Sequence, residues 1–312
     1  MRVYATGASG FVGRWLAREL HATGHKMLPA AGSHQIDITD ARALLDDMRA
    51  ARPDAVVHLA AVSYAPDAGA DPAAAMQVNV AGTDALFRAI AGLDPPPAVL
   101  AVSSSEVYGS PTPESLPLTE SAPIQPRTIY GLTKVGQEAS AVWAALRHEL
   151  RLVVVRPFNH TGPGQRPVFA VPAFVQRVLA LRAGEATSIR AGNIDVRRDI
   201  GDVRDVVRAY RLILERTRDG WPASPIILNV GTGRSVPIGE IIETLCRLAG
   251  VEPTIDVDPE LVRPGEPHEI VGDSTALAEA VGWSPRIPLA TTLADMLEDA
   301  QRHAAAATQA RH

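Results

Sequence analysis

The chain has 312 residues, 46% of them hydrophobic, so it is long and apolar enough for one large domain or two modest ones. Its formal net charge of −5 and the lack of a long basic run argue against nucleic acid as a partner. A single cysteine rules out an internal disulfide, no apolar run reaches the roughly 20 residues that cross a bilayer, and no secretory segment opens the chain, so we expect a cytoplasmic protein without a membrane partner.

The first predicted strand, residues 2–6, leads into a glycine-rich turn and then into an amphipathic helix. Gly7, Gly10 and Gly13 allow a tight turn, a close approach of the backbone to a pyrophosphate, and close packing of the helix on the strand. The amino terminus of the helix adds free N–H groups and the positive end of its dipole. This segment therefore predicts a dinucleotide-binding site.

Further apolar runs predict more buried strands, and helical patterns lie between them. The alternation up to about residue 160 predicts an α/β fold of the Rossmann type, a doubly wound parallel sheet whose ligands bind beyond the carboxyl ends of the strands. The predicted strands cover residues 26–30, 55–59, 98–103 and 152–155, and the predicted helices lie near 41–51, 73–92 and 128–149.

Tyr130 and Lys134 stand near the start of the helix predicted at 128–149. Positions i and i+4 share a helix face, so the two side chains point the same way. Lys134 is one of only two lysines among 30 basic residues, and a lysine ammonium beside a phenol lowers the phenol pKa from its usual value of about 10. The pair therefore predicts a tyrosine that gives or takes a proton near neutral pH.

From Thr161 onward, prolines and glycines mark a loop and the regular alternation ends. Residues 226–230 read as a strand that returns to the sheet, so two units are interleaved. We expect a dinucleotide-binding domain in residues 1–160, to which the chain returns at about 194–233, and a smaller α/β substrate-binding lobe mainly in 161–312.

Four further segments stand where a predicted strand ends or a helix begins: His58–Ala61, Asn79–Thr83, Ser103–Gly109 and Arg156–His160. Together with the spacing G-x-x-G-x-x-G and the distal Tyr-x-x-x-Lys, they resemble the extended short-chain dehydrogenase/reductase family over nearly the whole chain. The resemblance implies an enzyme that uses a nicotinamide dinucleotide. We predict no metal site.

The resemblance also gives roles to particular residues. Ser104 hydrogen-bonds the substrate carbonyl or carbinol oxygen, Tyr130 gives or takes the proton of that oxygen, and Lys134 tunes the phenol and holds the nicotinamide ribose. Glu106 is either a base at C5, as in sugar-nucleotide 4,6-dehydratases, or a carboxylate that orients neighbouring backbone groups. The predicted dinucleotide contacts are Gly7, Ser9, Gly10, Phe11, Val12, Gly13, Asp37 (on adenine), Ile38, Leu59, Ala60, Ala61, Asn79, Tyr130, Lys134 and Pro157.

Later segments resemble the branch of the family that contains the GDP-mannose 4,6-dehydratases and the GDP-6-deoxy-D-mannose reductases. These segments are Asn159–Gln165, Gly192–Asp195, Arg198–Ile200, Asp202–Val207 and Arg263–Glu266. The resemblance implies a GDP-sugar substrate, with Arg198 and Arg263 on its diphosphate and Glu266 on its ribose diol. The remaining predicted substrate contacts are Ser105, Glu106, Asn159 and Asn193.

The sequence contains little evidence on whether the cofactor is NADPH or NADH. The acid expected about 20 residues beyond the glycines, which binds the adenosine ribose and repels a 2′-phosphate, is missing. No arginine stands in residues 29–34 to hold a 2′-phosphate either. The missing acid favours NADPH slightly, with NADH tolerated.

By this resemblance we predict NAD(P)H-dependent reduction of the C4 keto group of GDP-4-keto-6-deoxy-D-mannose to GDP-D-rhamnose. The length of the chain favours this reaction over dehydration, because the dehydratases tend to be longer. GDP-mannose 4,6-dehydratase and a 4-epimerase or reductase acting on another nucleotide sugar remain open. A redox-sensing binding protein without catalysis is a different class, against which the intact Ser104, Tyr130 and Lys134 argue.

We also expect a homodimer. Apolar residues on the helix from Tyr130, among them Leu132, Trp143 and Leu146, and on the helix at 79–90 spread beyond one stripe about 100° wide. The resembled family pairs two such helices with their copies in a four-helix contact, whose area should exceed about 1,000 Å². The alternative is that Trp143 and its neighbours fill the core of their own chain.

Overall fold

A six-stranded parallel sheet forms the centre of the protein in the computed structural model, which describes residues 1–30, 36–218, 220–221, 224–262 and 265–309. The strand order is β2-β1-β3-β4-β5-β9, and every neighbouring pair is parallel. The predicted doubly wound α/β fold is therefore confirmed. The strands are β1 (Arg2–Thr6), β2 (Lys26–Pro29), β3 (Ala55–His58), β4 (Ala98–Val102), β5 (Leu152–Pro157) and β9 (Ile226–Val230).

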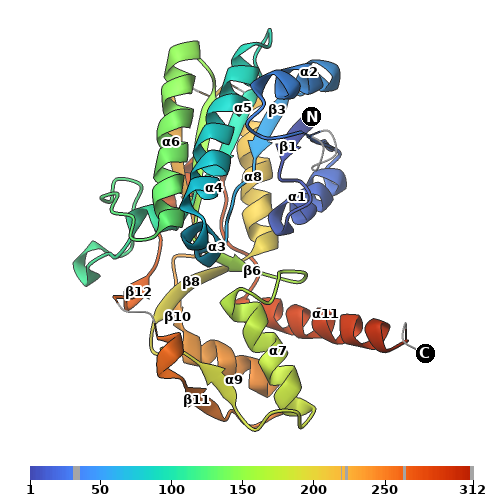
Figure 1. The fold of residues 1–312 in the computed structure, drawn as a ribbon, viewed down its shortest axis with the longest axis vertical. Coiled ribbons are helices and arrows are strands. Elements are labelled where there is room, and N and C mark those ends of the chain that lie inside the picture. Colours follow the sequence, from blue (N-terminus) through green and yellow to red (C-terminus); the bar gives the residue numbers. More distant parts are fainter. Residues whose placement is uncertain (31–35, 219, 222–223, 263–264, 310–312) are drawn as a thin grey trace.

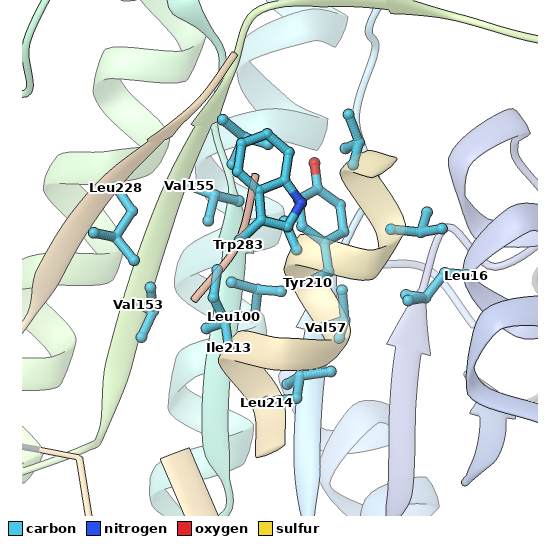
Figure 2. Packing of buried hydrophobic residues seen from close by; sticks show 14 of the residues in the cluster. Leu16, Val57, Leu100, Val153, Val155, Tyr210, Ile213, Leu214, Leu228 and Trp283 are labelled. Carbon is cyan, nitrogen blue, oxygen red and sulfur yellow. The ribbon is translucent and has the colours of Figure 1, made fainter. Parts of the chain in front are cut away.

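Helices cover both faces of this sheet (Figure 1). Successive side chains of a strand point to opposite faces, so Val57 joins one buried apolar cluster (Figure 2) and its neighbour Val56 the other. A strand that is buried on both sides is an unbroken run of apolar residues, and this is why these strands could be predicted from the sequence. The first face is covered by α1 (Phe11–Ala22), α8 (Val203–Arg218) and α10 (Thr275–Val281), and the second by α2 (Ala41–Ala51), α5 (Gly82–Ala91) and α6 (Ile129–His148).

Side-chain caps set where two of these helices begin. The carboxylate of Asp40 accepts from the backbone N–H groups of Arg42 and Ala43 at the start of α2. At the start of α6, the Thr128 hydroxyl accepts from the N–H of Gly131 at 2.9 Å. Each cap satisfies amides that have no partner within the helix, so the chain enters both helices at a defined residue.

The helix predicted at residues 73–92 is confirmed, because the backbone is continuously helical from Pro72 to Ala91 and contains one π-helical turn. Its parts are α4 (Pro72–Met76), the π-helical turn η1 (Gln77–Ala81) and α5, and a separate short helix, α3 (Ala65–Ala70), precedes them. Pro72 cannot continue a preceding helix, and Asp71 caps the new one by accepting from the N–H of Ala74. The π-helical turn contains Asn79, whose buried side chain is bonded outside the helix.

The other elements form a small lobe that lies below the sheet in Figure 1, and α11 runs outward from it. The small lobe is built on an apolar core shared by α7 (Ala170–Arg182), β7 (Ile189–Ala191), α9 (Ile238–Ala249), β11 (Ile255–Val257) and α11 (Leu289–Gln309). It is joined to the sheet through β6 (Asn159–Thr161), β8 (Arg197–Asp202), β10 (Ser235–Pro237) and β12 (Glu269–Ile270), and the short turns are η2 (Ser105–Tyr108), η3 (Pro113–Ser115) and η4 (Pro259–Leu261). Of the helices described here, none combines the length and the apolar character that a membrane span requires.

A buried ion pair joins α6 to the sheet. Arg156 on β5 is 2% exposed, and its guanidinium donates two hydrogen bonds to the Glu138 carboxylate, at 2.9 and 2.7 Å. Ser103, at the end of β4, donates to the same carboxylate. Both charges are out of water, so removal of one leaves the other without compensation.

We predict that Glu138→Ala lowers the free energy of unfolding by about 3–5 kcal/mol, because it leaves the Arg156 guanidinium buried and unpaired. Glu298→Ala is the matched control, since Glu298 pairs with Arg302 in an exposed contact that should contribute about 0–1 kcal/mol. Urea denaturation of both variants measures the difference. Equal losses in the two variants would contradict the expected cost of an unpaired buried charge.

Candidate active site

The glycine-rich turn is a cradle made of backbone. Gly7 has a φ of +70°, and a Cβ at this position would lie 2.7 Å from the Ala60 nitrogen. A Cβ at Gly13 would overlap the carbonyl of Ala8, and the Gly10 N–H donates to the Gly7 carbonyl at 3.0 Å. No side chain caps α1, so its first N–H groups face the turn. The cradle fits a pyrophosphate, and it lies between β1 and β3, where the strand order reverses.

The carboxyl ends of the six strands form one edge of the sheet, which we call the carboxyl edge. The residues that flank the glycine turn lie at this edge, as predicted from the sequence. Leu59, Ala60 and Ala61 follow β3, and Pro157 ends β5. Phe11 stacks on the His160 ring, with 6.4 Å between ring centroids and an interplanar angle of 9°. Ser9 and Val12 belong to the same turn and helix start.

Asp37 and Ile38 lie beyond β2. The Asp37 carboxylate is exposed and accepts from the N–H and the hydroxyl of Thr39, and these bonds lower its pKa. Ile38 packs against Gly82, where a Cβ would come within 2.8 Å of its side chain. Residues 31–35, which include most of the segment that decides between NADPH and NADH, lie outside the described residues.

Ser104 and Tyr130 meet at the end of β4. Ser104 caps η2, and its hydroxyl accepts from the N–H of Glu106 at 3.2 Å. Tyr130 stands in the first turn of α6, close enough to Ser104 for the serine hydroxyl to lower its pKa. A strand end and a helix start from distant parts of the chain therefore bring two hydroxyl groups together.

The expected lowering of the Tyr130 pKa is wrong for this structure. Burial raises the pKa of Tyr130 to about 12, the hydrogen bond with Ser104 lowers it, and the charge of Glu106 raises it. The ammonium of Lys134 lies 5.9 Å from the centre of the tyrosine ring. Tyr130 therefore holds its proton firmly at neutral pH, which suits a proton donor.

Lys134 is buried beside the end of β4. Its Nζ donates to the carbonyl of Val102 at 2.8 Å and to Oε1 of Gln137 at 2.7 Å. Burial lowers the pKa of Lys134 to about 7, and the nearby Glu138 carboxylate partly opposes this shift. The side chain is therefore a positioned amine that exchanges a proton close to neutral pH.

Glu106 lies beside this group. Thr128, at the start of α6, donates to Oε2 of Glu106 at 3.3 Å. The charge of Glu106 also acts on Tyr130, so the carboxylate is close to the phenol. Both proposed roles for Glu106, base or orienting group, are compatible with this position.

Asn79 is turned into the protein. Its Oδ1 accepts from the N–H of Val62 at 2.8 Å, and its Nδ2 donates to the Val62 carbonyl at 3.2 Å and to the Thr133 hydroxyl at 2.8 Å. Thr133 in turn donates to the carbonyl of Tyr130 at 2.7 Å. Asn79 thus ties the loop after β3 to α6, and its predicted contact with the dinucleotide stays a prediction.

Two residues of the site were missed in the sequence. Gln137 binds the Lys134 amine and also donates to the Val102 carbonyl at 3.2 Å, and Glu138 holds α6 on the sheet. They follow Lys134 at i+3 and i+4, so the spacing that identified Tyr130 and Lys134 could have extended to them.

The predicted nucleotide residues are only partly brought together. Arg198 donates to Oε1 of Glu266 at 2.7 Å and to backbone carbonyls, so the residue predicted for the diphosphate and the residue predicted for the ribose pair with each other. Asn193 accepts from the N–H of Asp195 within its own turn, and Asn159 is exposed at the start of β6. Ser105 is half-buried on η2. Arg263 lies outside the described residues.

Comparisons with known proteins agree with this geometry. The sequence profile of a family described as GDP-mannose 4,6 dehydratase matches residues 27–296. A GDP-6-deoxy-D-mannose reductase from Pseudomonas aeruginosa is 35% identical over 301 residues, covering 96% of each chain. The structure of RMD from Pseudomonas aeruginosa complexed with NADPH has a TM-score of 0.88 at 34% identity and covers 97% of this chain and 99% of that one. A UDP-glucose 4-epimerase from Stenotrophomonas maltophila with bound NAD has a TM-score of 0.85 at 25% identity, with coverages of 98% and 99%.

The fold and the site thus define a nicotinamide-dependent enzyme of the extended short-chain dehydrogenase/reductase class. The chain belongs to the GDP-mannose 4,6-dehydratase family.

We predict that Tyr130→Phe lowers turnover by about 10²- to 10⁴-fold, because the ring still packs but its proton is gone. The affinity for the dinucleotide should stay nearly unchanged. Steady-state kinetics and a binding titration measure the two quantities. Substantial residual turnover in this variant would refute the assignment of Tyr130 as the proton donor.

Lys134 should make stability depend on pH. Its folded pKa of about 7 lies below the ordinary 10.5, so between these values the unfolded chain binds more protons and stability rises with pH. Lys134→Met removes this contribution. From pH 7.5 to 9, the free energy of unfolding of the wild-type protein minus that of the variant should therefore increase by up to about 1.4 kcal/mol per pH unit. Denaturant unfolding at both pH values tests this, and parallel curves would contradict a lowered pKa.

Proposed function

We propose that the protein reduces the C4 keto group of GDP-4-keto-6-deoxy-D-mannose to give GDP-D-rhamnose, with NADPH as the reductant. The observation that carries the proposal is the meeting of Ser104, Tyr130 and Lys134 at the end of β4, beside the glycine cradle. The GDP-6-deoxy-D-mannose reductase at 35% identity supports the same substrate.

In the proposed reduction, Ser104, Tyr130 and Lys134 each have a different role. When bound, NADPH supplies the hydride for the C4 carbon. Ser104 holds the C4 oxygen by a hydrogen bond, and Tyr130 transfers its phenolic proton to that oxygen, so the carbonyl becomes a hydroxyl. Lys134, whose amine donates to Val102 and Gln137, would stabilise the phenolate and bind the nicotinamide ribose.

NADPH is the proposed reductant, with NADH tolerated. The solved relative with NADPH supports the first and the epimerase with NAD the second. Further proposed contacts come from Phe11 and Val12 at the start of α1 and from Leu59 and Ala60 after β3, all packed at the carboxyl edge.

The substrate nucleotide is proposed to bind against the small lobe. Arg198 and Glu266 form an ion pair there, and in the proposed complex Arg198 binds the diphosphate and Glu266 the ribose diol. Asn159 and Asn193 complete the proposed contacts. With this assignment, residues 1–160 and the return at about 194–233 serve the dinucleotide, the rest of 161–312 serves the sugar nucleotide, and the enzyme works in the cytoplasm.

GDP-mannose 4,6-dehydratase activity is the second candidate, and Glu106 is the observation that favours it. The carboxylate lies close to Tyr130 and within reach of the substrate oxygen that Ser104 would hold. In a dehydratase such a carboxylate would take the proton from C5. The family profile that matches the chain is named for this reaction.

We expect the purified protein to oxidise NADPH only when a 4-keto sugar nucleotide is present. GDP-4-keto-6-deoxy-D-mannose should yield GDP-D-rhamnose, identified by chromatography and NMR, and GDP-mannose alone should yield no 4-keto product. Steady formation of the 4-keto-6-deoxy sugar from GDP-mannose would assign the dehydratase reaction, with Glu106 as the base.

We also propose a homodimer that pairs α6 and its neighbouring helices with a second copy. Trp143 is 59% exposed and Leu146 is 65% exposed, so the alternative that Trp143 and its neighbours fill the core of their own chain is wrong. Leu132 lies on the same side of α6 and is 45% exposed, whereas Leu86 and Phe87 on α5 are fully buried against the sheet. The exposed apolar row on α6 is the kind of surface that a second subunit covers.

Light scattering at micromolar concentration should therefore give a mass about twice the 33.1 kDa of one chain. Trp143→Glu should reduce the mass to that of one chain without loss of helix content, because a carboxylate would be desolvated in the contact. A mass near 33.1 kDa for the unaltered protein would exclude the dimer at this concentration.

A further inference from the structure

Arg127 is an exposed arginine in the segment that leads into α6, three residues before Tyr130. Within the described part of the chain, no ion pair and no hydrogen bond holds its guanidinium. The roles assigned so far do not use this charge. Its surroundings place it where the sheet domain meets the small lobe.

Backbone contacts fix the segment that carries Arg127 at this boundary. The N–H of Leu118 donates to the carbonyl of Val271, just after β12, at 2.9 Å. Figure 1 shows the segment before α6 next to β12. A Cβ on Gly109 would collide with the Gln125 carbonyl and would lie 3.2 Å from Cγ of Arg127. The glycine therefore lets the stem of the arginine pack directly on the backbone that follows η2.

The guanidinium of Arg127 reaches the small lobe at Gly265. A Cβ on Gly265 would lie 3.6 Å from Nη2 of Arg127. Glu266 is the next residue, with its Cα about 3.8 Å further along the chain. Its Oε1 accepts from Arg198 of β8 at 2.7 Å. Arg127 from the sheet domain and Arg198 from β8 thus approach the same turn of the small lobe.

The three charged side chains at this turn leave one positive charge uncompensated. Glu266 is paired with Arg198, so its carboxylate balances one guanidinium and not the second. A guanidinium binds phosphate oxygens through two parallel N–H···O hydrogen bonds, and it keeps its charge at any physiological pH. The excess charge beside Arg198 therefore suits an anionic phosphate group.

The position of Arg127 relative to Tyr130 suits a diphosphate in particular. In a sugar nucleotide the diphosphate is attached at C1, which lies across the hexose ring from C4. With C4 at Tyr130 and the nucleotide against the small lobe, the diphosphate lies one sugar ring away, between the two domains. We propose that Arg127 binds the diphosphate of the sugar nucleotide from the sheet domain, opposite Arg198. This inference rests on the proposed sugar-nucleotide substrate.

The test measures GDP binding by calorimetry, with the protein saturated with NADPH so that GDP cannot occupy the dinucleotide site. Arg127→Gln removes the charge, and its affinity for GDP should fall about 10- to 100-fold, the effect of lost charge-assisted hydrogen bonds. Arg127→Lys should have an intermediate affinity, because lysine keeps the charge without the planar fork. The affinity for NADPH and the thermal midpoint without ligand should stay unchanged in both variants, since no internal bond is lost.

Arg302→Gln is the matched control. Arg302 is exposed on α11, where it pairs with Glu298, so this variant changes the net charge of the protein by the same amount. Its affinity for GDP should equal that of the wild-type protein. The comparison separates a contact with the diphosphate from the general effect of protein charge on an anion.

Two results with Arg127→Gln would overturn the inference. One is an unchanged affinity for GDP, which would leave the proposed function standing. The other is a lower thermal midpoint with equal losses of affinity for GDP and NADPH, which would mean that the arginine supports the fold. If the wild-type protein binds NADPH but not GDP, the proposed GDP-sugar substrate fails and the inference fails with it.

Discussion

The carboxylate of Glu138 holds the helix that carries Tyr130 and Lys134 onto two neighbouring strands. Its oxygens receive the Arg156 guanidinium from β5 and the Ser103 hydroxyl from the end of β4. Because Tyr130, Lys134 and Glu138 follow one another at intervals of four residues, they share one face of α6, and the anchored carboxylate decides where the other two side chains meet the sheet. Such a pair contributes little net stability, but it is costly to break, so it preserves the geometry of the site.

A second set of buried hydrogen bonds links the glycine turn to the same helix. His58 lies between the hydroxyls of Thr6 and Thr83, at 2.8 Å from each. Burial lowers the pKa of His58 to about 3, and the charge of Lys134 lowers it further, so the ring stays neutral and can accept from one hydroxyl while donating to the other. The bonds continue from Thr83 through Asn79 and Thr133 to the backbone of Tyr130. The two halves of the proposed site are therefore held in fixed relation by polar contacts that exclude water.

Features that depend on local spacing could be predicted from the sequence. The strands are short apolar runs, the glycine turn needs glycine at fixed intervals, and Tyr130 and Lys134 share a helix face. Each of these features is therefore a recognisable pattern in the amino-acid sequence. The π-helical turn at Asn79, inside a helix that was predicted, has no such pattern, because it accompanies contacts with Val62 and Thr133 that exist only in the folded chain. The Tyr130 pKa was predicted in the wrong direction, since spacing shows the neighbouring lysine but not the depth of burial. The pairing of Arg198 with Glu266 joins residues far apart in the chain and has no local signature.

The position of β9 in the sheet affects how the chain can be made. β9 pairs with β5, Val153 opposite Ile226, only after the chain has passed through β6, α7, β7, β8 and α8. During synthesis β5 is therefore an open edge strand of apolar residues until β9 emerges, and such an edge invites pairing with other chains. Parallel pairing between distant segments is also slow to form. Nascent chains that stop before β9 should thus be the ones that aggregate or need a chaperone, because their sheet lacks its last strand.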